Sequence, residues 1–122
     1  MIERMDCACA DVLVDALFAL TLTPPAQRRP LLMGLVEREA IVDEVGNVIV
    51  PVQPVPRLVV AAHMDTVYGR AYKNYRLDVR ENERGLVLRG TLDNSAGCAV
   101  AAVLSHLLPD DVPVWFAFTV GE

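Results

Sequence analysis

Four side chains suited to metal binding or proton transfer stand where segments of the sequence begin or end. His63 and Asp65 directly follow the apolar run 58–62. Asp93 opens a helix-like stretch, and Glu122 ends a second apolar run. Because ligands of an open α/β sheet bind beyond the carboxyl ends of its strands, these side chains can meet in one crevice. The pattern indicates a metal site with a general base beside it.

The residue types fit that chemistry. Zinc accepts imidazole nitrogen and carboxylate oxygen together, and His63 offers the first while Asp93 offers the second. Asp65 lies two residues after His63, so in an extended segment its carboxylate can accept the other ring N–H and fix the tautomer. Glu122, at the end of an apolar strand, is a plausible acceptor for a proton from a metal-activated water.

Each residue also has a simpler interpretation. A His-x-Asp triplet is usually an ordinary turn. Asp93 can be the N-cap of the helix that follows, and Glu122 a solvated carboxylate. A serine hydrolase that uses Ser95 with His63 or His106 is disfavoured, since Ser95 lacks the Gly-x-Ser-x-Gly turn that exposes a nucleophile. The occurrence of all the acidic and imidazole groups at one sheet edge favours the metal site.

Hydrophobic periodicity predicts the elements that position these residues. Helix spacing covers 9–20, 27–39 and 94–108, and prolines follow the first and last of these. Alternating apolar and polar residues predict hairpins, whereas near-continuous apolar runs predict strands buried on both faces. The predicted hairpins are 40–50 and 77–89, and the predicted buried strands are 57–62 and 114–120. Alternation of strands and helices favours a layered α/β sheet.

Composition restricts the class of protein. The 122 residues suit one domain, and a net charge of −5 argues against a nucleic-acid surface. No apolar run is long enough to predict a membrane span or a signal peptide. The three cysteines, Cys7, Cys9 and Cys98, lack zinc or redox spacing and are interpreted as reduced thiols of a cytoplasmic protein. An apolar share of 53% predicts either association with another chain, a homo-oligomer among the options, or that the chain is part of something larger.

Three motifs together resemble the co-catalytic zinc exopeptidases and amidohydrolases. They are Ala-His-Met-Asp-Thr-Val at 62–67, Gly-Thr-Leu-Asp-Asn-Ser-Ala-Gly-Cys-Ala at 90–99, and Phe-Thr-Val-Gly-Glu at 118–122. The segment 42–48 also looks like the "D..GN" segment of that clan, which includes tripeptide aminopeptidase, glutamate carboxypeptidase and succinyl-diaminopimelate desuccinylase. Order and spacing agree from about residue 8 onward.

The resemblance implies a three-layer α/β sandwich with a mixed, mostly parallel central sheet. Residues 1–122 would be the N-terminal part of a zinc-peptidase-like catalytic domain, without a second domain. By this resemblance His63 binds one zinc and Asp65 orients that histidine. Asp93 bridges two zincs and is followed by a cis peptide, and Glu122 is the general base. The complete site holds two Zn²⁺, with Co²⁺ or Mn²⁺ as alternatives.

The resemblance leaves the substrate open. The spacing from His63 to Asp93 suits the carboxypeptidase and tripeptidase branch, whereas Asp-Asn-Ser-Ala-Gly at 93–97 leans towards certain aminopeptidases. The substrate is therefore a peptide or an N-acyl amino acid. The chain lacks the family's second glutamate and later ligands, so we expect little activity from it alone and exposed sheet edges. The alternative is a non-catalytic or vestigial small α/β domain that acts through association.

Overall fold

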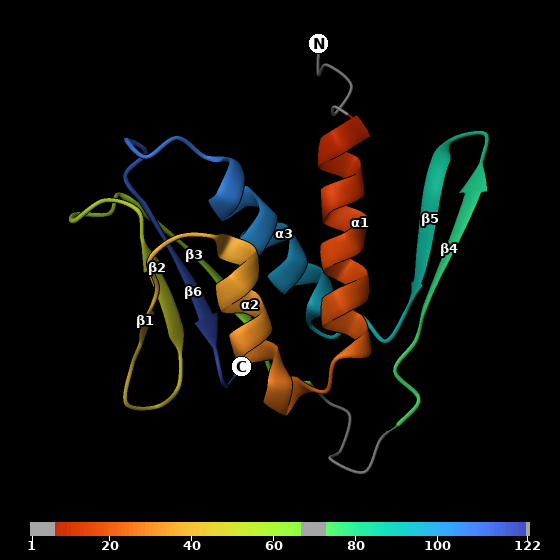
Figure 1. Cartoon of the computed structure of the whole chain (residues 1–122), viewed down its shortest axis with the longest axis horizontal. Coiled ribbons are helices and arrows are strands. Elements are labelled where there is room, and N and C mark those ends of the chain that lie inside the picture. The colour runs from red at the N-terminus through yellow and green to blue at the C-terminus, as the bar shows by residue number, and fades with distance from the viewer. Residues whose placement is uncertain (1–6, 67–72, 122) are drawn as a thin grey trace.

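The computed structural model describes residues 7–66 and 73–121, where helical elements come first, five strands follow, and a helix and a last strand complete the order (Figure 1). The helical elements are α1 (Cys7–Leu22), η1 (Pro25–Gln27), α2 (Arg28–Val36) and α3 (Ser95–Leu107). The strands are β1 (Ile41–Val42), β2 (Val48–Pro51), β3 (Leu58–His63), β4 (Leu77–Asn82), β5 (Gly85–Gly90) and β6 (Val114–Thr119). No helix in the described ranges is long and apolar enough to cross a bilayer.

The main sheet has four strands in the order β1, β2, β6 and β3. Strand β6 pairs antiparallel with β2 and parallel with β3, which confirms a mixed, partly parallel α/β sheet. Among the described strands, β3 with β6 is the one parallel pair. His63 lies opposite Thr119 in this pair, so the carboxyl ends of both strands reach the same edge of the sheet.

The helices cover one face of this sheet. Helix α3 contacts β3 and β6, and α1 and α2 pack against α3. Phe116 and Phe118 of β6 are fully buried in the core on this face. On the opposite face, Val59 and Ala61 are exposed, so the prediction of strands buried on both faces does not hold within the described residues. The expected third layer is not seen within the described residues.

A side-chain network at the β1–β2 turn holds the end of β6. The Oδ1 atom of Asp43 accepts the backbone N–H groups of Val45, Gly46 and Asn47 at 2.9–3.0 Å. Gly46 has a φ of +105°, a conformation that glycine adopts without a Cβ clash. The Oδ1 atom of Asn47 accepts the N–H of Val120 at 2.9 Å. The turn thereby fixes the chain just beyond β6.

The β4–β5 hairpin leads directly to Asp93. Figure 1 shows α1 between this hairpin and α3. At the base of the hairpin, the N–H of Thr91 donates to the carbonyl of Arg76 at 3.0 Å. A Cβ on Gly90 would overlap that same carbonyl oxygen, so the close approach of the two strands requires glycine. This tight base sets where the segment that carries Asp93 leaves the hairpin.

Candidate metal centre

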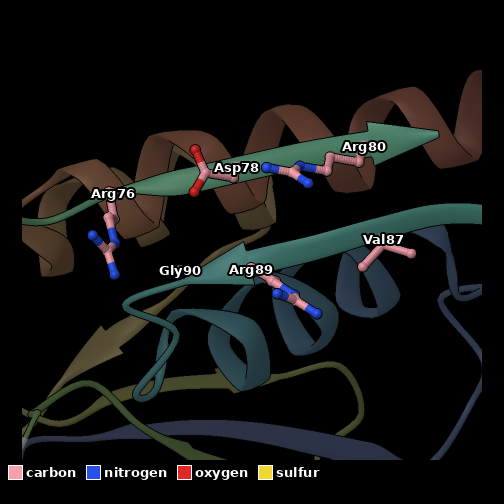
Figure 2. A pocket seen from close by; sticks show the side chains of 6 residues that line it. All are labelled: Arg76, Asp78, Arg80, Val87, Arg89 and Gly90. Atoms are coloured by element: carbon pink, nitrogen blue, oxygen red, sulfur yellow. The ribbon is translucent and has the colours of Figure 1, made fainter.

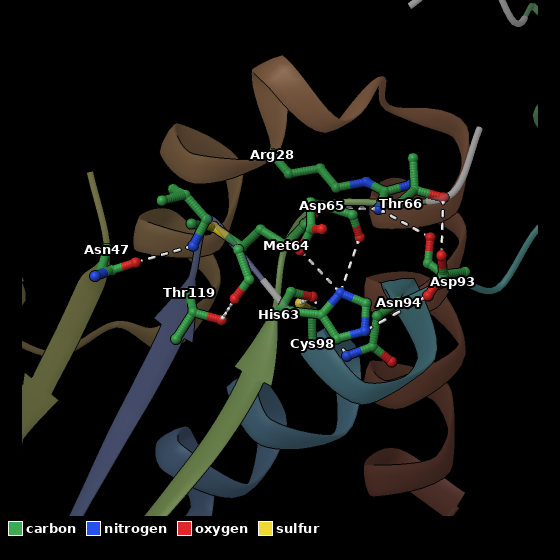
Figure 3. Close-up of polar contacts among 12 residues, drawn as sticks. Arg28, Asn47, His63, Met64, Asp65, Thr66, Asp93, Asn94, Cys98 and Thr119 are labelled. Atoms are coloured by element: carbon green, nitrogen blue, oxygen red, sulfur yellow. Dashed lines mark hydrogen bonds and ion pairs between the residues drawn. The ribbon is translucent and has the colours of Figure 1, made fainter. Parts of the chain in front are cut away.

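His63 is the last residue of β3, and Asp65 controls the orientation of its ring. The Nδ1 atom of His63 lies 3.0 Å from Oδ1 of Asp65 and 3.1 Å from the Asp65 carbonyl oxygen (Figure 3). Both partners of Nδ1 are acceptors, so Nδ1 carries the proton in the neutral ring. The Nε2 atom then keeps its lone pair and is available as a metal ligand.

Asp93 faces the free side of that imidazole. Its Oδ1 lies 3.5 Å from Nε2 of His63, while its Oδ2 accepts a hydrogen bond from Oγ1 of Thr66 at 3.3 Å. A separation of 3.5 Å is long for a direct N–H···O bond. Two ligand atoms about 2.0–2.2 Å from one tetrahedral zinc are about 3.4 Å apart. The His63–Asp93 separation therefore fits two ligands of one zinc ion.

The structure brings together three of the four residues that the sequence singled out. His63, Asp65 and Asp93 converge at the carboxyl edge of the sheet (Figure 3). Their roles stay predictions, since geometry alone does not test them. Glu122 lies outside the described residues, which end at Gly121, two residues after β6, the strand beside β3.

The centre contains two candidate metal ligands within the described part of the chain. No group of three histidine, cysteine, aspartate or glutamate side chains there is arranged to hold an ion. A catalytic zinc usually has three protein ligands, so His63 and Asp93 form part of such a site. The Asp93–Asn94 peptide is cis, which confirms the expectation for that bond.

Two neutral side chains that sequence reasoning missed hold the backbone of His63. The Nδ2 group of Asn94 donates to the His63 carbonyl at 3.3 Å, and the thiol of Cys98 donates to the same oxygen at 3.2 Å. Burial raises the pKa of Cys98 to about 11, so this residue stays a neutral thiol donor. The only sequence signal for either was its place in the first turn of the helix after Asp93.

The simpler interpretations of the site residues fit less well. The N-cap of α3 is Asn94, and no side chain makes a capping hydrogen bond there. Ser95 is fully buried and its hydroxyl lies 2.7 Å from that of Thr21, so it is not an exposed nucleophile. His106 is exposed near the other end of α3, where its Nδ1 lies 3.3 Å from a Glu37 carboxylate oxygen. It is thus a surface histidine, remote from the candidate centre.

Two surface hollows differ in their relation to the centre. One of about 400 Å³ adjoins it, since Met64 and Asp65 line it together with Val120 and residues of η1. The other, of about 440 Å³, lies on the β4–β5 hairpin, and Arg76, Arg80 and Arg89 surround it (Figure 2). The hairpin hollow has no imidazole or thiol in its lining, so it is not a metal centre. Of these two hollows, the one beside Asp65 adjoins the candidate centre.

Comparison with solved structures defines the class of fold. The chain superposes on the crystal structure of aminoacylhistidine dipeptidase from Vibrio alginolyticus with a TM-score of 0.59 and 17% sequence identity. The match covers 100% of this chain and 29% of that one, so the chain spans less than a third of the length of this structure. The sequence matches no family model and no curated protein. The chain therefore shares the fold of one part of that structure.

Proposed function

We propose that this chain is part of a zinc-dependent hydrolase that cleaves a peptide or amide bond. The observation that carries the proposal is the 3.5 Å separation of His63 Nε2 and Asp93 Oδ1, with Nδ1 held by Asp65. An imidazole whose second nitrogen is fixed by a carboxylate is the usual form of a histidine ligand. The fold shared with part of a dipeptidase agrees with this class of reaction.

Each site residue of the chain would have a separate role. His63 binds the ion through Nε2, Asp65 holds the tautomer, and Asp93 supplies the carboxylate ligand that can bridge two ions. Zinc, when bound, supplies the Lewis acidity that activates a water and polarises a carbonyl. Glu122 takes the proton from the attacking water, as a base placed just beyond β6. Strand β6 supports this role because Thr119 lies opposite His63.

The substrate class is a peptide or an N-acyl amino acid, with aminopeptidase, carboxypeptidase and deacylase activities as alternatives. We propose that further ligands come from polypeptide outside the described residues, because His63 and Asp93 are two of the three that catalysis needs. The same reasoning predicts little hydrolysis by the 122 residues alone. Zn²⁺ is the proposed metal, with Co²⁺ or Mn²⁺ as alternatives, and the cytoplasm is the proposed location.

A specific observation favours the alternative of a non-catalytic domain that acts through association. Strand β3 has no partner strand on its outer side within the described residues. Leu58 and Val59 of this strand are 61% and 53% exposed. An open, aliphatic strand edge pairs readily with another chain, and a homo-oligomer is one such pairing. This alternative requires no metal.

Zinc titration of the protein, followed by the ring resonances of its two histidines, separates the two functions. A hydrolase centre predicts that zinc shifts the His63 signals, while His106 on the far end of α3 serves as an internal control. Equal shifts of both histidines, or none, would favour the non-catalytic domain. Hydrolysis of a panel of dipeptides and N-acyl amino acids by the zinc-loaded chain then tests the substrate class.

A further inference from the structure

Arg28 is a fully buried cation directly behind the candidate metal centre. It is the first residue of α2 and has 0% exposed surface, whereas its neighbour Arg29 is exposed. Within the described residues no carboxylate forms an ion pair with it. Desolvation lowers the pKa of its guanidinium, and that effect is opposed by Cys98 and Tyr75, once these are ionised at high pH, and by Asp93. A buried charge without a paired carboxylate costs stability, so its retention calls for a reason.

The guanidinium of Arg28 joins three segments of backbone. Its Nε donates to the carbonyls of Leu20 and Thr23 at the end of α1, each at 3.0 Å. Its Nη1 makes longer contacts with the carbonyls of Met64, at 3.4 Å, and Asp93, at 3.5 Å. Figure 3 shows the side chain passing over the segment that carries Asp65.

The last two contacts bear on the metal ligands. Met64 directly follows His63, and Asp93 is itself the second ligand candidate. One planar group therefore spans the two segments whose separation sets the distance from Nε2 of His63 to Oδ1 of Asp93. A guanidinium suits this task because its rigid plane places Nε at the carbonyls that end α1 and Nη1 at those of the two ligand segments. An ammonium group has one nitrogen and cannot do both.

We propose that Arg28 is a positioning residue of the metal centre, which fixes the spacing of His63 and Asp93 through the backbone carbonyls of Met64 and Asp93. The proposal rests on the metal site proposed above. Arg28 touches neither the ion nor a substrate. It acts on metal affinity because it holds the two ligands at the separation that one ion requires.

A second arginine of the chain provides a matched control. Arg38 donates to the carbonyls of Ser105 and Leu108 and pairs with Asp110 at 2.7 Å, near the C-terminal end of α3. It thus joins backbone segments as Arg28 does, but away from the ligands. A general loss of stability should appear when either Arg28 or Arg38 is replaced, whereas a loss of ligand positioning should appear only when Arg28 is replaced.

The test is Co²⁺ and Zn²⁺ affinity of the wild type, Arg28→Met and Arg38→Met, with urea unfolding to confirm that each is folded. We expect Arg28→Met to weaken metal binding by about 10–100-fold, the usual effect of removing a group that orients a ligand. The Co²⁺ absorption spectrum should also change, because it reports the ligand geometry. Arg38→Met should destabilise the fold and leave affinity and spectrum unchanged.

The other possible results would count against the positioning role of Arg28 or against the metal site. Unchanged affinity in folded Arg28→Met, or an equal loss in Arg38→Met, would overturn the positioning role. If Arg28→Met does not fold, Arg28→Lys decides. The lysine keeps the charge but has a single nitrogen, so it cannot hold the end of α1 and both ligand-segment carbonyls at once. Wild-type affinity in that variant would therefore refute the proposal. A wild-type chain that binds neither ion refutes the metal site itself, and the positioning role with it.

Discussion

Replacement of Asp93 by alanine separates a metal ligand from a structural carboxylate. The two contacts of Asp93 described above, with Thr66 at 3.3 Å and His63 at 3.5 Å, are long, and its side chain is 32% exposed. The loss of these two contacts alone should lower the free energy of unfolding by less than about 1 kcal/mol. Removal of the carboxylate also takes a negative charge from beside the buried Arg28, which adds to the loss. Loss of a true N-cap would cost about 0.5–2 kcal/mol, but the N-cap of α3 is Asn94.

The effect on metal binding should be far larger than the effect on stability. Asp93 is one of two ligands in the described centre, and even groups that only orient a ligand contribute about 10–100-fold to affinity. We therefore expect Asp93→Ala to lower zinc affinity by at least about 100-fold. Competition with a coloured chelator measures the affinity, and urea unfolding in the absence of zinc measures the stability.

The matched control is Asp43→Ala in the β1–β2 turn. The carboxylate of Asp43 accepts four hydrogen bonds, including one from the Asn47 side chain. Asp43 directly follows β1, and β1 and the strand that carries His63, β3, are opposite edges of the main sheet. This variant should lose stability and keep zinc affinity. If Asp93→Ala instead loses stability and binds zinc as the wild type does, the carboxylate is structural and the metal site is wrong.

Three further predictions concern other parts of the fold. Burial raises the pKa of Cys98 from 9.0 to about 11. The thiol therefore ionises first in the unfolded chain, so the free energy of unfolding should fall as the pH rises from about 9 to about 11. This loss should approach about 3 kcal/mol and be absent from the pH profile of Cys98→Ala unfolding. Asn47→Ala should speed hydrogen exchange of the Val120 amide, since Asn47 Oδ1 is its acceptor, and protection equal to wild type would contradict this. Val59→Lys should reduce self-association in sedimentation at unchanged thermal stability, because Val59 is 53% exposed on an open strand edge.

The order and type of the elements could be predicted from the sequence because their periodicity is strong. The helix over 94–108 and the hairpin around 82–85 have the expected types, and the bounds differ by a residue or two. The second helix is shorter than 27–39, since α2 ends at Val36 and Glu37 takes a left-handed φ of +50°. A helix end of this kind depends on local backbone geometry that periodicity does not report.

Burial was harder to predict than element type. An apolar run shows that a strand can be covered on both faces, but not that both faces are covered. The run 58–62 indicates a strand covered on both faces, yet Val59 and Ala61 are exposed within the described residues. The sequence pattern is that of a strand with a cover on its second face. Exposed aliphatic residues on this scale typically mark an interaction surface, which agrees with association or with a larger domain.

The residues that support the centre through its backbone could not be predicted from the sequence, and the reason is physical. Arg28 stands in the polar pair Arg28-Arg29, where charge alone predicts two solvated side chains. Arg28 is nevertheless buried, because backbone carbonyls at the end of α1 and in the segments of Met64 and Asp93 converge on its guanidinium. Backbone acceptors carry no sequence signature, so residues that bind them escape motif analysis.

The same observation bears on how the ligands are held. Asn94 and Cys98 hold the carbonyl of His63, while Arg28 contacts those of Met64 and Asp93. All three donors act on the backbone, so the carboxylates and the imidazole lose none of their capacity to bind an ion. A centre built this way keeps its side-chain ligands close together before a metal arrives. Changes in the three donors should therefore alter metal affinity through geometry, whereas changes in the ligands remove binding itself.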